Sequence, residues 1–302
     1  MIYACLRRVF LLVLLISSMA GQAADRYKPF VLAYTSDAAL EDVISDVKSK
    51  LQSAGFEVLT DYRPYDGASA LVVSSSDLKA LSNESKLSGF ASTLRVGVNQ
   101  VEDGVQVSYL NPEYLGKAYR IESDMGTYTQ ALAAALGDGE AYGSNKGLTE
   151  KKLRKYHYTF GMEYFDDPYV LGEFGSQQEA LNAVRAGFAN NSAGVSSLYE
   201  LTLNRADTAI FGVSMAGKGD DDSKYYDDAY QMSIVDFKEH KSSAYLPYQV
   251  LVVDGEVLAL HMRFRMAVHF PDLSMMGKHS FMTLMPSPKA IQGALTAAVN
   301  GE

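Results

Sequence analysis

PFVLAYTS, at residues 29–36, and PYVLGEFGS, at residues 168–176, are two versions of one pattern. Each has a proline, an aromatic residue and Val-Leu, followed by a small residue and a second aromatic residue. The apolar run predicts a strand in both places. Because a predicted helix follows each strand, the pattern indicates a strand–helix unit that occurs twice in the chain.

The residues after each predicted strand have the period of an amphipathic helix. In the first copy Ser36 is the expected N-cap and Gly55 the expected terminator. In the second copy Ser176 and Glu179 form a capping box. The apolar stripes, with three- and four-residue spacing, comprise Leu40, Val43, Ile44, Val47 and Leu51 in the first copy and Leu181, Val184 and Phe188 in the second.

The two copies continue in parallel. Further strands are predicted at 56–62 and 70–74, and at 198–203 and 209–214. The leading proline and the closing serine are 45 positions apart in one copy (29 to 74) and 46 in the other (168 to 214). Each copy then has a predicted hairpin with an Asp-Gly turn, at Asp103-Gly104 and Asp254-Gly255. We interpret the shared opening and matched spacing as an internal duplication rather than a chance similarity of two ordinary units.

The stretch between the copies divides the chain into two domains. An Ala-rich helix at 128–136 ends at Gly137, and a loop is expected at 143–147. Thr149 is the expected N-cap of a short helix at 150–155, which leads into an aromatic strand at 156–165. The expected organisation is a signal peptide (1–23), a first α+β domain (24–136), a linker with a short helix (137–155) and a second α+β domain (156–302). Each domain is expected to be a small antiparallel sheet with a helix packed on one face.

The first 23 residues have the layout of a secretory signal peptide. Arg7 and Arg8 precede the apolar core Val9–Ile16, and small residues at 21 and 23 place the cleavage near Ala23. The alternative, a membrane anchor, needs a run of about 20 apolar residues. We therefore expect export to the periplasm and no transmembrane segment in the mature chain.

Composition excludes several classes of protein. The 302 residues are 47% hydrophobic and 21% charged, as in ordinary globular proteins. The net charge of −9 argues against binding to nucleic acid, which needs a basic face. Cleavage would remove Cys5, the single cysteine, and with it any thiol nucleophile, CxxC pair or thiolate metal site.

The first copy resembles domain-of-unknown-function family 302, a small α+β domain of bacteria and archaea. The resemblance covers roughly residues 29–115 and, more loosely, 168–271, so the second copy would be the more divergent. It rests on the strand FVLAYTS, the helix end LQSAGFEVLT, the strand ALVVSS and the hairpin VEDGVQVSYLNP. The Gly-Leu-Pro-Leu-type segment of some members is absent, where this chain has LSGFASTLRVGV. The resemblance implies a fold and no catalytic residues.

The segment 261–285 is rich in methionine and histidine. Thioether and imidazole groups select Cu(I), and a His–Met pair can also hold a haem iron. Met266 with His269 and Met276 with His279 are the candidate ligand pairs for copper or haem. The alternative is that methionines fill a core, with Met262, Phe264 and Met266 as the buried face of a strand. The neighbours His261, Arg263 and Arg265 would then point outward.

Two further charged groups are candidate sites. Arg263 and Arg265, on one face of that strand, could bind a carboxylate or phosphate, or could pair with local acids such as Asp254, Glu256 or Asp272. The acidic run 220–222 with Asp227 and Asp228 offers oxygen ligands for Ca²⁺ but lacks the D-x-D-x-D-G spacing, which favours a solvated loop.

No sequence signature of an enzyme is present. The chain has no G-x-S-x-G, H-E-x-x-H, G-x-x-x-x-G-K-[ST] or G-x-G-x-x-G motif in the required context. A Ser/His/Asp arrangement assembled in space stays open. We expect a non-enzymatic protein that binds a small-molecule ligand, or another periplasmic protein, in the groove between its domains. The alternative is a copper or haem protein that uses the segment 261–285.

Overall fold

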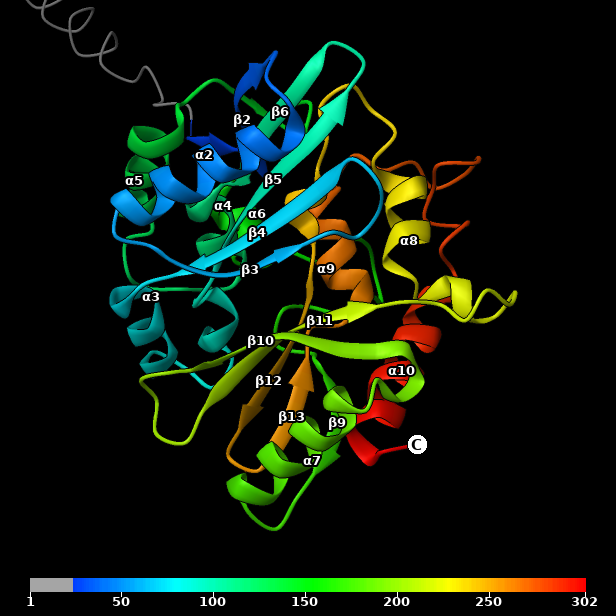
Figure 1. Cartoon of the computed structure of the whole chain (residues 1–302). Helices are drawn as coiled ribbons and strands as arrows, with labels where there is room; N and C mark the ends of the chain where they lie inside the picture. Colours follow the sequence, from blue (N-terminus) through cyan, green and yellow to red (C-terminus); the bar gives the residue numbers. More distant parts are fainter. Residues whose placement is uncertain (1–23) are drawn as a thin grey trace, which may run out of the picture.

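The computed structural model describes residues 24–302, and the predicted signal peptide lies outside the described residues. No helix within residues 24–302 is both long enough and apolar enough to cross a membrane. Two antiparallel sheets organise this part of the chain, one in the upper half and one in the lower half of Figure 1. The expected α+β class is confirmed.

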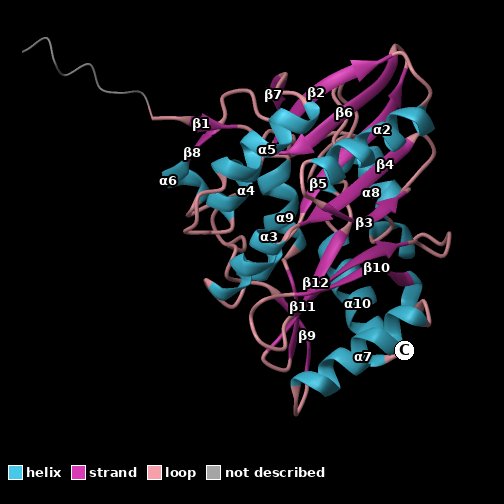
Figure 2. Ribbon diagram, turned by 60° about the vertical axis from the view of Figure 1, so that its left-hand side comes forward, coloured by secondary structure: helices cyan, strands magenta, loops and turns pink. Residues whose placement is uncertain are grey.

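The N-terminal half is built on a six-stranded antiparallel sheet with the order β3-β4-β5-β6-β2-β7. Its strands are β2 (Phe30–Ser36), β3 (Glu57–Tyr62), β4 (Ala68–Ser74), β5 (Leu94–Val101), β6 (Gly104–Leu110) and β7 (Glu140–Tyr142). The helices of this half are α2 (Leu40–Ser53), α3 (Ser76–Ala80), α4 (Pro112–Ala118), α5 (Gly126–Leu136) and α6 (Glu150–Leu153). Helices α2 and α5 pack against each other on one face of the sheet (Figures 1 and 2).

The C-terminal half is built on a five-stranded antiparallel sheet with the order β10-β11-β12-β13-β9. Its strands are β9 (Tyr169–Glu173), β10 (Val195–Thr202), β11 (Ala209–Met215), β12 (Tyr248–Val253) and β13 (Glu256–Ala259). Its helices are α7 (Gln177–Ala189), α8 (Asp228–Val235), α9 (Met262–His269) and α10 (Ser287–Asn300). Helices α7 and α10 pack together on one face (Figure 2).

The two sheets share one connectivity. In each half the first strand along the chain lies beside the fifth, and the remaining strands follow in sequence order. A helix follows the first strand in both, α2 and α7, and each packs on a later helix of its own half, α5 or α10. Strand β7 extends only the first sheet, at its β2 edge.

Residues 137–155, expected as a linker with a short helix, contribute structure to the N-terminal half. Strand β7 pairs with β2, and β8 (Leu148–Thr149) pairs with β1 (Arg26–Tyr27). The Thr149 hydroxyl accepts a hydrogen bond from the Lys152 amide, which confirms the expected cap of α6.

The second face of the six-stranded sheet is polar, and a segment of the C-terminal half covers it. The Ser243 hydroxyl donates to Asn99, and the Gln106 side chain bonds the backbone of residues 239 and 241. The approach is close, because a Cβ at Gly97 would lie 2.5 Å from Ser243 Oγ. Buried polar side chains on this face form hydrogen bonds with the covering segment. They therefore avoid the free-energy cost of an unpaired buried polar group.

The prediction of a strand at 156–165 is wrong. Gly161 has φ +77°, and the Met162 amide donates to the Thr159 carbonyl, so a turn breaks the extended chain. Tyr156 is buried and donates its hydroxyl to the Ala267 carbonyl, while Phe160 is 98% exposed. The aromatic alternation therefore does not produce two faces of a strand.

The expected caps and turns are confirmed in the second copy and shifted in the first. The Ser176 hydroxyl accepts from the Glu179 amide, and Asp254 and Gly255 both have positive φ at the hairpin tip. In the first copy the residue that precedes the helix is Ala39 and not Ser36. Gly104 is already part of strand β6, where it pairs with Val101 of β5. The hairpin tip is therefore Glu102-Asp103.

Candidate functional site

The candidate residues of 261–269 lie on a helix, α9, and not on a strand. All of its residues except Arg263 are buried. A helix buried on nearly every side has no amphipathic stripe, so periodicity could not separate it from a buried strand. The alternation of Met262, Phe264 and Met266 is therefore no guide to the faces of this segment.

Arg263 and Arg265 do not share a face. The Arg263 guanidinium is 43% exposed and lies 3.0 Å from Glu163, while Arg265 is buried. Two residues along a helix differ by about 200° in direction, which separates the two side chains. The expected joint anion site is not assembled by these two residues. Neither pairs with Asp254, Glu256 or Asp272 among residues 24–302.

A second buried arginine, Arg95 of β5 in the N-terminal half, contacts the same two carbonyl groups as Arg265. Arg265 Nη2 donates to the carbonyls of Tyr245 and Pro247, and Arg95 Nη1 lies 3.4 and 3.3 Å from the same two oxygens. The Arg265 guanidinium also lies over the Tyr245 and Tyr248 rings, at 3.8 and 4.4 Å from their centroids. Cation–π contacts and carbonyl hydrogen bonds thus replace a carboxylate partner. Burial and the Arg265 charge lower the pKa of Arg95.

We expect Arg265→Lys to lower the free energy of unfolding by about 2 kcal/mol, because an ammonium cannot reproduce the planar fork and ring stacking. Chemical denaturation measures the change. Arg263→Lys is the matched control, since it keeps the charge of an exposed ion pair and should change stability by less than about 0.5 kcal/mol. Equal effects of the two substitutions would contradict a structural role for the buried guanidinium.

The four candidate metal ligands occupy two different environments. Met266 and His269 are fully buried in α9. His269 Nδ1 lies 2.7 Å from the Arg265 carbonyl, and burial with the charges of Arg95 and Arg265 holds its pKa well below the usual range. Two guanidinium cations beside this imidazole oppose the binding of a third cation.

Met276 and His279 lie in the loop between α9 and α10. Met276 is exposed, and His279 Nδ1 lies 2.9 Å from the Ile234 carbonyl. The predicted pair from α9 and the predicted pair from this loop therefore differ in both burial and charge environment.

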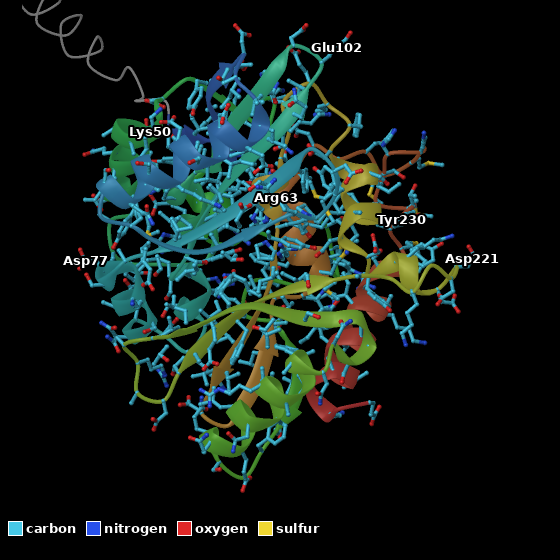
Figure 3. The ribbon with its side chains drawn as sticks, viewed as in Figure 1. Lys50, Arg63, Asp77, Glu102, Asp221 and Tyr230 are labelled. Atoms are coloured by element: carbon cyan, nitrogen blue, oxygen red, sulfur yellow. The ribbon has the colours of Figure 1, made fainter. Side chains whose placement is uncertain are left out.

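The acidic segment 220–228 uses carboxylates as caps. Asp220 accepts from the backbone amides of residues 222 and 223, and Asp227 accepts from the amides of Gly217 and Tyr230 at the start of α8. Asp221 projects from the loop tip and pairs with Lys224 (Figure 3). Among residues 24–302 no three His, Asp or Glu side chains come together as a metal site. The solvated-loop interpretation fits residues 220–222, but it is wrong for Asp228, which is buried at the start of α8.

A cavity of about 430 Å³ lies where the β7 edge of the first sheet meets the C-terminal half. We call it the interface cavity. It is lined by Lys28 and residues 140 and 142–145 on one side, and by residues 235–240, 242, 270, 272 and 273 on the other. Its volume falls within the range of small-molecule sites, roughly 300–1,000 Å³.

Aromatic rings and one histidine form part of the wall of the interface cavity. His240 Nε2 lies 3.3 Å from Glu140 Oε2, and its ring meets the Tyr142 ring edge-on at 5.2 Å. His240 Nδ1 is buried and has no hydrogen-bond partner within residues 24–302. The rings of Phe237 and Phe270 complete the apolar part of the lining. These rings give the lining an apolar part against which a ligand can pack.

Charged groups of both signs line the same cavity. Asp236 accepts from the Ser242 amide and the Tyr65 hydroxyl, and burial raises its pKa to about 6. Asp272 accepts from the Asn145 amide. Lys28 and Lys238 have no carboxylate within 4 Å in the described part of the chain.

The interface cavity has no local signature in the sequence. Its lining comes from the expected linker, from the end of α8 and from the loop after α9, which are far apart along the chain. Residues 235–242 belong to the connection between β11 and β12, which is longer than the corresponding β4–β5 connection of the first copy. A longer connection at one place of a repeat is the sequence signal that could have indicated this site. No serine hydroxyl lies within hydrogen-bond distance of His240 among residues 24–302, so no Ser–His pair is present in this lining.

Comparison with known proteins gives limited information. No model of a known protein family matches the chain, and no curated protein matches it. One matching solved structure is that of an uncharacterized conserved protein DUF302 from Bacillus stearothermophilus. The match has 18% identity and a TM-score of 0.32, and it covers 36% of this chain and 95% of that chain. No residue role follows from it.

Proposed function

We propose that this protein binds a small charged organic molecule in the interface cavity and does not act as an enzyme. The single observation that carries the proposal is the cavity of about 430 Å³, which is lined from both halves by aromatic rings and by charged side chains of both signs. Ligand sites are typically concave and mostly apolar, with a few polar groups that fix orientation.

The lining favours a ligand with a ring or apolar body and groups of both charge signs. Tyr142, Phe237 and Phe270 offer surfaces for a ring, while the Lys28 and Lys238 ammonium groups are free to pair with an anion. Glu239 and Asp272 are exposed carboxylates that can pair with a cationic group. Such mixed charge fits a zwitterion better than a simple anion or cation.

A thermal-shift screen tests the proposal directly. The panel comprises aromatic and aliphatic amino acids, dipeptides, aromatic amines and aromatic carboxylates, and calorimetry measures the affinity of each hit. We expect at least one zwitterionic class to raise the melting temperature, because a ligand that binds only the folded state stabilises it. No stabilisation by any member of the panel would count against the proposal.

Phe237→Ala should weaken binding of the hit about tenfold, which corresponds to about 1.4 kcal/mol and to the loss of one aromatic contact. Phe237 is 47% exposed, so the fold tolerates its truncation. Phe160→Ala removes an exposed ring outside the cavity lining and serves as the control with unchanged affinity.

We further propose that the chain is an exported periplasmic protein made of two tandem copies of a family 302-like domain. The shared strand order of the two sheets supports the duplication, and the sequence of residues 1–23 supports export. Fractionation followed by N-terminal sequencing should give a periplasmic protein that begins at Ala24. An intact N-terminus in the cytoplasm would overturn the proposed location.

A further inference from the structure

Four methionines in one loop have no packing role that explains them. The loop 274–285 joins α9 to α10 and carries Met275, Met276, Met282 and Met285, which are 43%, 79%, 52% and 64% exposed. Buried methionines of the described chain, such as Met215 and Met266, fill cores. That role does not apply to the four methionines of the loop, which are exposed.

Backbone hydrogen bonds bring the methionine-bearing ends of the loop together. The Met282 amide donates to the Met275 carbonyl at 3.2 Å, and the Met285 amide donates to the Met282 carbonyl at 3.3 Å. A further bond from the Phe281 amide to the Ser274 carbonyl closes the base of the loop. Residues seven positions apart in sequence are therefore neighbours in space.

His279, within the same loop, is held in the tautomer of a metal ligand. A carbonyl oxygen only accepts, so the 2.9 Å contact with the Ile234 oxygen places the proton on Nδ1 and the lone pair on Nε2. The ring is also fixed by stacking on Phe237, at 4.3 Å between centroids. Metal-binding histidines commonly donate their other nitrogen to a carbonyl in this way.

We propose that the loop 274–285 is a Cu(I) site, with ligands drawn from the thioethers of Met275, Met276, Met282 and Met285 and from His279 Nε2. Soft thioether and imidazole ligands select Cu(I) over Zn²⁺ and harder cations. The one cationic side chain in the loop, Lys278, is exposed, so solvent screens its charge. This site is distinct from the buried Met266 and His269, which lie beside two arginines.

Competition with bicinchoninate, a chromogenic Cu(I) chelator, under anaerobic reducing conditions tests the site. All proteins carry Cys5→Ser, so that no thiol competes. We expect one Cu(I) per chain in the otherwise unchanged protein. The double variant Met275→Leu/Met282→Leu and, separately, His279→Gln should each weaken Cu(I) binding more than about 100-fold, because losing only a hydrogen-bond partner of a metal ligand already costs roughly 10–100-fold.

Met125→Leu is the matched control, because it removes a buried thioether of the N-terminal half and should leave the affinity for Cu(I) unchanged. Titration of methyl-labelled methionine with Ag(I), a diamagnetic substitute for Cu(I), should shift the NMR signals of the four loop methionines and leave that of Met125 in place. Loss of all copper to the chelator, or equal binding by the variant with all four loop methionines replaced by Leu, would overturn the proposal. None of the substituted residues within 24–302 lines the interface cavity.

Discussion

Gly187→Ala is expected to lower the free energy of unfolding by about 3 kcal/mol or more. Gly187 lies in α7 where that helix packs on α10, and an added Cβ would stand 1.7 Å from the Ala298 carbonyl oxygen. The obstacle is backbone, which cannot rotate away as a side chain can. Relief therefore requires the two helices to separate, and this loses contacts along the whole outer face of the second sheet.

Gly293→Ala, in the partner helix α10, is the matched control. No atom lies within 4 Å of a Cβ built there, so the change adds only helix propensity and should stabilise by about 0.5–1 kcal/mol. Urea denaturation of both variants gives the two free energies. A Gly187→Ala protein as stable as the unchanged one would contradict the close packing of α7 on α10.

Asp228→Asn is expected to become progressively more stable than the unchanged protein as the pH rises from 4 to 7.5. Asp228 is buried at the start of α8, where it accepts from the Tyr62 hydroxyl and the Met215 amide. Burial raises its pKa to about 7, against 3.8 for an exposed carboxyl, and Arg265 offsets only part of this effect. Asparagine keeps one acceptor and removes the titration.

The sign follows from proton binding. Between pH 4 and 7 the folded protein holds a proton on Asp228 that the unfolded chain has released, so raising the pH destabilises the fold. The three-unit difference in pKa corresponds to a loss on the order of 4 kcal/mol across this range. Asp236, with its pKa raised to about 6, adds a smaller loss in the same direction.

Histidine titration changes the stability with pH in the opposite direction to Asp228. The stability of the variant is therefore compared with that of the unchanged protein at each pH. Burial lowers the pKa of His269, so the unfolded chain binds a proton below about pH 6.5 that the fold does not. The two proteins share this effect, and their difference isolates Asp228. The Asp221 side chain is 99% exposed, so the stability of Asp221→Asn should change with pH in the same way as that of the unchanged protein. A parallel profile for Asp228→Asn as well would refute the role of burial.

Local sequence was sufficient to predict an element and its buried residues where that element has one buried face and one exposed face. Helix α2 buries the predicted residues Val43, Ile44, Val47 and Leu51. The Asp254-Gly255 turn has the positive φ angles that its residue types favour. In each case the residues that decide the structure are adjacent or one helical turn apart.

Local sequence did not predict the structure correctly where a segment is buried by distant parts of the chain. The apolar pattern of α9 is that of a strand, yet it forms a helix whose last carbonyls accept hydroxyls from Tyr114 and Tyr156. The polar face of the first sheet, typical of an exposed surface, is covered by residues 239–247. Neither contact has a local signature.

The sequence by itself determined the α+β class, most strand and helix positions and the cluster of methionines, because these depend on composition and short-range period. Only the tertiary structure decided that Arg265 is buried beside Arg95, that four methionines are exposed and that β7 and the segment 235–242 line one cavity. The physical reason is that burial, electrostatic environment and concavity are properties of the surfaces that meet, and these surfaces come from distant parts of the chain: 150 residues separate Arg95 from Tyr245, and 100 separate Glu140 from His240.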